Sequence, residues 1–223
     1  MSRPLPLLHH LRHPLRGLYR FWMRWHLGDE RYAFMWDAPP EGEWVSLDCE
    51  TTGLNVQRDE IIAISAVRIR GNRLLTSERL ELLIKPRQTE VNADAVRVHG
   101  LLARDLQGGL TADEALPQLL EFIGSRPLVG YFLEFDLAML NRALFPLLGV
   151  PLPQARHEVS SMYHAWRFAQ QSALQQQVGT PIDLRFDSMM DALQLPRRPA
   201  HNPLNDAVMA GLAFVKLRAL LAM

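Results

Sequence analysis

The sequence of 223 residues contains a single cysteine, Cys49, and its formal charges sum to zero. A lone cysteine excludes a disulfide within the chain and a zinc site built from several cysteines. No apolar run reaches the roughly 18 residues that a membrane span needs. Without net charge there is no overall field to attract a polyanion, which excludes broad coating of nucleic acid but leaves room for a local site. We therefore expect a cytoplasmic globular protein.

The first segment, residues 1–37, differs in composition from the rest. Its arginines recur every four residues, so on a helix after Pro14 they form a basic stripe beside apolar side chains. The stripe contains Arg12, Arg16, Arg20 and Arg24, and its apolar neighbours are Leu11, Leu15, Leu18, Phe21, Trp22 and Trp25. This helix could dock on the next domain by its aromatic rings, with the arginines outward. Alternatively, residues 3–31 bind a nucleic-acid backbone, an anionic membrane or a protein partner.

Residues 38–43 read as a linker, and residues 44–223 as one α/β domain. Alternating patterns and turn residues predict strands over Trp44–Cys49, Ile61–Arg70, Arg73–Ile84 and Pro127–Tyr131, with a Gly71-Asn72 hairpin turn between the second and third. Helices are predicted from the Thr111–Glu114 capping box, from Phe135 to Leu147, over most of residues 151–198, and from the Asn202-Pro203 start to the end. An antiparallel hairpin followed by alternating strands and helices indicates a mixed sheet flanked by helices.

Two carboxylates lie two residues apart on the first predicted strand, at Asp48 and Glu50. Side chains alternate along a strand, so both point to one face, while Cys49 points to the other as a small buried hydrophobe. Like charges side by side repel, and a hard divalent cation such as Mg²⁺ or Mn²⁺ would make them compatible. Thr51 and Thr52 follow as local hydrogen-bonding groups at a turn.

Further acidic residues are needed to complete a metal site, and two positions suit this role. Asp136 lies where a short strand gives way to a helix, and Asp206 lies in the first turn of the last helix, whose positive end favours a carboxylate. His201 lies in the loop before that helix. It could swing over Asp206 and accept a proton from a metal-bound water.

These residues resemble the motifs of a known family, the DEDDh 3′–5′ exonucleases, which include the proofreading subunit of bacterial replicative polymerases. DxETTG (Asp48–Gly53), FD (Phe135-Asp136) and HxxxxD (His201–Asp206) occur in the family's order. VHGL (Val98–Leu101) also resembles a turn between its first two motifs. Motifs in series are far more specific than any one of them.

The resemblance implies an RNase H-like fold and two divalent ions, Mg²⁺ or Mn²⁺. The metal ligands would be Asp48, Glu50, Asp136 and Asp206, with His201 completing the catalytic set. The enzyme would then remove 5′-mononucleotides from the 3′ end of single-stranded DNA or short RNA. Thr51, Thr52 and Leu54 would contact the terminal nucleotide.

The second motif departs from the family pattern, because Tyr131-Phe132 stands where many relatives have His-Asn. These aromatic rings could bind substrate by stacking on a base, or they could fill the core. An alternative to the nuclease is a non-catalytic nucleotide-binding adaptor, recruited through its N-terminal helix. Retention of all four acids and the histidine favours the enzyme.

Overall fold

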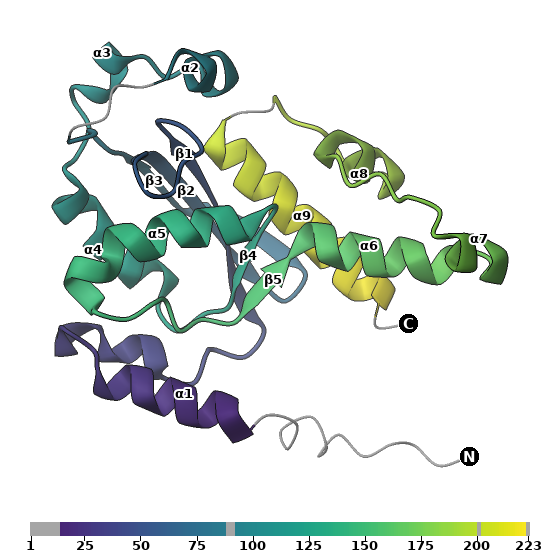
Figure 1. Ribbon diagram of the computed structural model, residues 1–223, viewed down its shortest axis with the longest axis horizontal. Coiled ribbons are helices and arrows are strands. Elements are labelled where there is room, and N and C mark those ends of the chain that lie inside the picture. The colour runs from purple at the N-terminus through teal and green to yellow at the C-terminus, as the bar shows by residue number, and fades with distance from the viewer. Residues whose placement is uncertain (1–13, 88–91, 200–201, 222–223) are drawn as a thin grey trace.

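The computed structural model describes residues 14–87, 92–199 and 202–221. Its five-stranded sheet has the order β3-β2-β1-β4-β5 (Figure 1). The strands are β1 (Glu43–Thr51), β2 (Ile61–Arg70), β3 (Arg73–Leu83), β4 (Leu128–Gly130) and β5 (Arg156–Glu158). The helices are α1 (Pro14–Trp25), the 3-10 helix η2 (Glu30–Trp36), α2 (Ala93–His99), α3 (Ala103–Leu106), α4 (Ala112–Ile123), α5 (Leu133–Leu148), α6 (Val159–Gln170), α7 (Ala173–Val178), α8 (Phe186–Ala192) and α9 (Pro203–Leu221).

The sheet is mixed, as the sequence predicted. Strand β2 pairs antiparallel with both β1 and β3, whereas β4 pairs parallel with β1 and β5. One strand was not expected: β5 lies inside the stretch 151–198, which reads as mainly helical. Its three residues are too few to produce an alternating pattern, and they become a strand only by pairing with β4.

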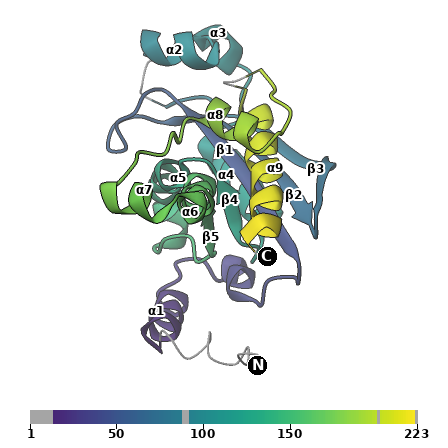
Figure 2. The same ribbon diagram turned by 90° about the vertical axis from the view of Figure 1, so that its right-hand side faces the viewer.

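Helices cover both faces of the sheet (Figure 2). Val45, Leu47 and Cys49 point into a core shared with α4 and α5. The other face of the sheet packs mainly on α9, α6 and α8, through residues such as Ile69 and Phe214. The alternation along β1 therefore places Asp48 and Glu50 on the face that α9 covers, and Cys49 lies buried on the opposite face, as predicted.

Small residues let α9 approach β1 closely. The buried Ser46 hydroxyl donates a hydrogen bond of 2.7 Å to the Ala207 carbonyl oxygen. One turn further, a Cβ added at Gly211 would lie only 3.3 Å from the Ser46 Cβ and 3.0 Å from Leu74. This close packing fixes the distance between β1 and α9. It thereby positions the first turn of α9, which carries Asp206, near the end of β1.

Helix α1 does not dock on the domain by its aromatic rings, which was one of the alternatives from the sequence. Met23 and Leu27 of its inner face join the core under β1, and the Arg20 guanidinium donates to the Pro153 carbonyl oxygen at 2.9 Å. Arg24 pairs with Glu30 at 2.7 Å. The Arg20 and Arg24 side chains therefore face the domain, and the aromatic rings of α1 face outward. Docking by the aromatics is wrong because the long arginine side chains reach carbonyl and carboxylate partners while their stems cover apolar surface.

The division into residues 1–37, 38–43 and 44–223 stays a prediction. In the structure α1, η2 and the sheet contribute to one hydrophobic core. No described helix combines the length and the apolarity that a bilayer crossing requires.

We predict that Ser46→Ala lowers the free energy of unfolding by about 1 kcal/mol, because it removes one buried hydrogen bond between β1 and α9. Urea denaturation measures this change. The matched control is Ser125→Ala, whose exposed hydroxyl makes a longer bond of 3.4 Å to the Ala38 carbonyl oxygen and should matter little. Equal effects at both positions would contradict the role assigned to Ser46.

Candidate active site

Three carboxylates converge where β1 ends beneath the start of α9. Asp48, Glu50 and Asp206 each offer an oxygen, and these oxygens all lie within 4.8 Å of one another. The first two come from alternate positions of β1 and the third from the first turn of α9. Residues 156 positions apart in the sequence (50 and 206) thus meet, as the motif reading predicted.

Asp136, the fourth predicted ligand, lies next to this group in the first turn of α5. It is only 5% exposed, and its carboxylate accepts a hydrogen bond from the Cys49 backbone N–H. It lines the same pocket as the other three acids, and its charge raises the pKa of Asp48. All four predicted acids are therefore gathered at one place.

The protonation of these acids reflects their crowding. Burial raises the pKa of Asp48 well above its usual value, and repulsion by the neighbouring carboxylates raises it further. Burial also raises the pKa of Asp136, although the Cys49 hydrogen bond opposes the shift. For Glu50, burial and then the charge of Asp206 raise the pKa to about 7. Carboxylates this close together repel one another when ionised, and positive charge between them would relieve this repulsion.

The donor set fits a hard divalent cation. All of the ligand atoms are carboxylate oxygens, which Mg²⁺ and Mn²⁺ prefer. Asp48, Glu50 and Asp206 would hold such an ion directly, and Asp136 lies in the same pocket. Bound cations would also lower the raised pKa values, because they favour the ionised form.

A pocket of about 780 Å³ opens over the acids. It is lined by Asp48, Cys49, Glu50, Leu54, Tyr131, Phe132, Glu134, Phe135, Asp136, Glu158, Ser160, Ser161 and Asp206. Its wall is aromatic: the Tyr131 ring stacks on Phe186 with centroids 4.4 Å apart, and its hydroxyl donates to the Leu184 carbonyl oxygen. Phe132 and Leu54 are exposed at its edge. This wall offers apolar surface to a planar group beside the acids.

Glu158, which belongs to none of the motifs, holds this wall in place. Phe132 has a positive φ of 53°, an uncommon conformation for a residue with a bulky side chain. The Glu158 carboxylate accepts hydrogen bonds from the backbone N–H groups of Phe132 at 3.0 Å and Leu133 at 2.7 Å, and also from Ser160. It thereby caps the starts of both α5 and α6. Its position at the end of β5 is the feature that could have indicated this role, but a strand of three residues leaves no pattern in the sequence.

The two threonines after Glu50 use their hydroxyls inside the protein. Thr51 donates to the Gly53 carbonyl oxygen at 2.6 Å, and Thr52, fully buried, accepts from the Glu60 backbone N–H at 3.0 Å. They shape the turn after β1, and their predicted contact with a nucleotide stays a prediction. The same holds for Leu54, Tyr131 and Phe132.

His201 lies outside the described residues. The residues that follow it are described: the Asn202 side-chain oxygen accepts from the Asn205 backbone N–H at 3.1 Å. This bond is consistent with the predicted cap at the start of α9. The role of His201 as a general base stays a prediction.

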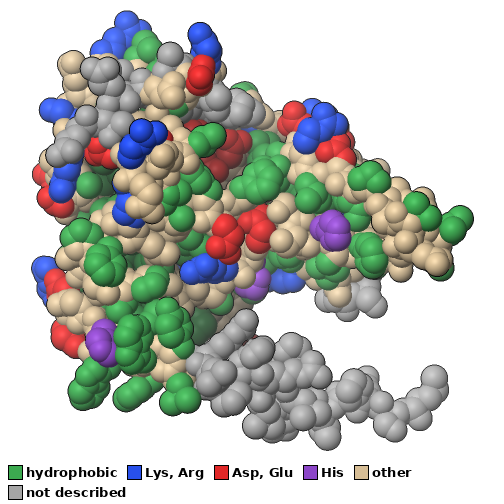
Figure 3. All heavy atoms as spheres, in the orientation of Figure 1, with side chains coloured by type: hydrophobic (Ala, Val, Ile, Leu, Met, Phe, Trp, Pro, Cys, Tyr) green, Lys and Arg blue, Asp and Glu red, His purple; other side chains and the backbone are tan. Residues whose placement is uncertain are grey.

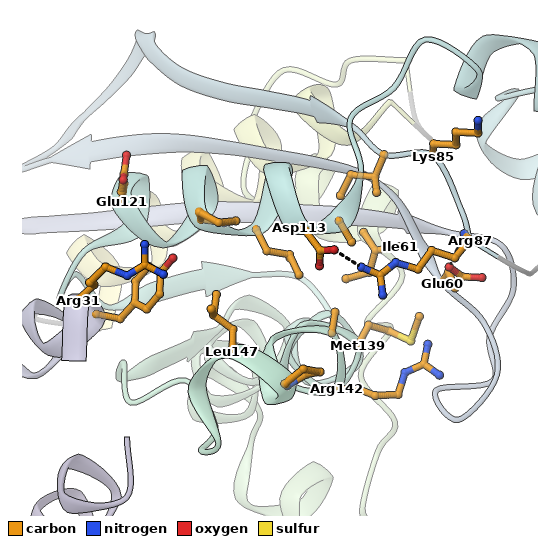
Figure 4. A pocket seen from close by; sticks show the side chains of 17 residues that line it. Arg31, Glu60, Ile61, Lys85, Arg87, Asp113, Glu121, Met139, Arg142 and Leu147 are labelled. Atoms are coloured by element: carbon orange, nitrogen blue, oxygen red, sulfur yellow. Dashed lines mark hydrogen bonds and ion pairs between the residues drawn. The ribbon is translucent and has the colours of Figure 1, made fainter. Parts of the chain in front are cut away.

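A second pocket, of about 690 Å³, lies between α4 and α5 on the other face of the sheet (Figure 4). Arg87 pairs with Asp113 across it at 2.6 Å. Arg142, also on its lining, donates to the Asp59 carbonyl oxygen and so anchors the loop between β1 and β2. Its apolar floor includes Ile61 and Met139. We assign it no chemistry, because the acids converge on the opposite face of the sheet.

Comparison with known proteins agrees with this geometry. A family model described as exonuclease (RNase T) matches residues 45–214. This chain belongs to that exonuclease family. The match includes the parts of β1, α5 and α9 that carry the four acids, and it confirms the recognition made from the motifs.

Individual relatives match only in part. DNA polymerase III subunit epsilon of Aquifex aeolicus is 32% identical over 102 residues, which are 46% of this chain and 49% of that protein. The PolC-type DNA polymerase III of Thermotoga maritima is 32% identical over 110 residues, which are 49% of this chain and 8% of that protein. The matched stretch is therefore half or less of these relatives' length.

Solved structures of exonuclease I share the fold. The enzyme from Methylocaldum szegediense superposes with a TM-score of 0.66 at 19% identity, covering 79% of this chain and 40% of that chain. E. coli exonuclease I in complex with a dT13 oligonucleotide gives 0.64 at 15% identity, covering 79% and 41%. The predicted RNase H-like fold of this family is thereby confirmed.

We predict that the metal-free protein loses stability as pH rises from about 4.5 to about 7. In this window folded Glu50 keeps its proton while unfolded Glu50, with its ordinary pKa of 4.5, releases it; rising pH therefore favours unfolding. Partial exposure limits the contribution of Glu50 to this loss to the order of 2 kcal/mol. Urea denaturation in the presence of a chelator, at several pH values, measures it. Glu50→Gln should flatten the dependence, and an unchanged slope in that variant would contradict the assignment.

Proposed function

We propose that this chain is a metal-dependent 3′–5′ exonuclease of the DEDDh type, which releases 5′-mononucleotides. The convergence of Asp48, Glu50 and Asp206 within 4.8 Å is the observation that supports it most strongly. Membership of the exonuclease family supplies the reaction class, since the match spans residues 45–214. The order of the motifs and the nearby Asp136 support the DEDDh type.

The chain's own groups divide the work of phosphodiester hydrolysis. The four carboxylates hold the metal site, which when filled by two divalent ions supplies charge stabilisation for the attacking and leaving oxygens. His201 accepts the proton of the attacking water. The side chains of Tyr131 and Phe132 form a stacking surface for the terminal base, at the pocket wall that Glu158 fixes.

We propose single-stranded DNA or short RNA as the substrate. E. coli exonuclease I has been crystallised with the single-stranded oligonucleotides dT13 and dA16, and it shares this fold. Stacking on aromatic rings is tolerant of sequence, because every base has a flat face. Such a site requires an unpaired end, which agrees with a pocket whose aromatic edge is exposed. Matched DNA and RNA oligomers would rank the two substrates.

We predict that the wild-type protein with Mg²⁺ or Mn²⁺ shortens a 5′-labelled oligonucleotide stepwise from its 3′ end. Asp48→Asn should slow this by roughly 100-fold or more, because it removes a ligand charge. Gel electrophoresis of the labelled products measures both. Glu134→Gln is the matched control: this exposed acid lies on the pocket rim and pairs with Arg156 instead. Full activity in Asp48→Asn would contradict the proposal, and nucleotide binding without turnover in the wild type would favour the adaptor.

For His201→Ala we predict a fall in kcat of roughly 10²- to 10⁴-fold with KM little changed, as expected for loss of a general base. The rise of kcat with pH near the histidine pKa should disappear in the variant. Steady-state kinetics across pH measure both effects. His164→Ala, which removes an exposed imidazole of α6, should leave the profile unchanged. A variant that keeps the wild-type profile would remove His201 from the mechanism.

A further inference from the structure

The outward face of α1 is the largest group of exposed apolar side chains that the structure describes on one helix. Leu18, Tyr19, Phe21, Trp22 and Trp25 are each between 51% and 78% exposed. In the space-filling view hydrophobic side chains gather over this helix (Figure 3). An exposed patch of this kind marks an interaction surface, because water disfavours so much contiguous apolar area.

The two faces of α1 have different partners. Residues 20, 23, 24 and 27 repeat at helical spacing and face the domain, where Met23 and Leu27 are buried. Residues 18, 21, 22 and 25 repeat at the same spacing on the opposite side. The helix is thus already anchored by its inner face, and docking on the domain does not explain its outer face. Within the part of the chain that the structure describes, the ring–ring contacts of the outer face are among its own rings and with His26: Tyr19 stacks on Trp22, Phe21 meets Trp25, and Trp22 meets His26.

Charge and residue type indicate what covers this face. The first 28 residues contain five arginines and neither aspartate nor glutamate. The Arg20 guanidinium donates to carbonyl oxygens, so its charge is not neutralised by a carboxylate. Trp and Tyr prefer the boundary between water and lipid, where an apolar ring and a polar edge are both satisfied. A basic helix with such an apolar face is typical of a membrane-surface anchor.

The position of α1 also suits an anchor better than a path for nucleic acid. Figures 1 and 2 both place α1 beyond the end of the sheet at which β1 begins, whereas the carboxylates lie where β1 ends. The nine residues of β1 make eight steps of about 3.3 Å, which separate the two ends of the strand by about 26 Å. A molecule resting on its α1 face would leave the active-site pocket open to solution.

We propose that the outward face of α1 binds the surface of an anionic lipid bilayer. The twelve-residue helix lies in the plane of the headgroups with its aromatic rings inserted, and the net positive charge of residues 1–28 attracts the negative lipids. The proposal is independent of the reaction assigned to the pocket, because no residue of α1 lines it.

Co-sedimentation of the full chain with vesicles tests this proposal. Vesicles of phosphatidylcholine mixed with phosphatidylglycerol should bind the protein, vesicles of phosphatidylcholine alone should bind it weakly, and added salt should release it. Phe21→Ser combined with Trp25→Ser should reduce binding about tenfold or more, because both rings leave the apolar face. The matched control, Leu174→Ser with Val178→Ser, removes two similarly exposed apolar side chains of α7 and should bind like the wild type.

Nuclease activity of both double variants on an oligonucleotide, and their circular dichroism, should match the wild type. Failure of the wild type to bind anionic vesicles would overturn the proposal, as would undiminished binding by the α1 variant. A concentration-dependent dimer that dissociates in the α1 variant, in the absence of vesicle binding, would assign this face to a second copy of the chain instead.

Discussion

Mutual repulsion among buried carboxylates is the constraint around which this protein is organised. The alternation of β1 puts Asp48 and Glu50 on one face, and the close approach of α9 brings Asp206 against them. In an ordinary domain this arrangement would be selected against, since burial and repulsion raise the pKa values of Asp48, Glu50 and Asp136 and cost stability at neutral pH. A divalent cation turns the same arrangement into a binding site. The fold thus pays in stability for a site that metal ions complete.

Packing contacts made by other residues serve this arrangement. Ser46 and Gly211 keep the contact between β1 and α9 close, so the first turn of α9 reaches the strand end. Arg142 holds the loop that follows β1 from the opposite face of the sheet. Glu158 caps two helix starts and fixes the backbone that carries Phe132. Each contact sets the position of a group at the pocket, although none of these residues belongs to a motif.

Much of this could be predicted from the sequence, because the decisive patterns are local. Period two along β1 predicted that Asp48 and Glu50 share a face, and the start of α9 predicted Asp206. Other features depend on tertiary contacts that no local pattern encodes. Strand β5 exists only through its pairing with β4, and so the capping role of Glu158 could not be foreseen.

The orientation of α1 could not be predicted from the sequence either, for a different reason. Both faces of that helix offer a plausible packing surface, one aromatic and one of arginine stems with Met23. Hydrophobicity alone favoured burying the rings, yet carbonyl acceptors such as that of Pro153 selected the arginine side. The result separates the protein into two ends, with the acids at the end of β1 and an apolar helix face beyond its start.

The most direct test of the central constraint is an NMR titration of the Glu50 carboxyl carbon with and without Mg²⁺. Our account predicts a pKa of about 7 in the metal-free protein, caused by burial and by the charge of Asp206. Saturating Mg²⁺ should lower this value markedly, since the cation favours the ionised form. An ordinary pKa in the metal-free protein, unmoved by Mg²⁺, would contradict the account.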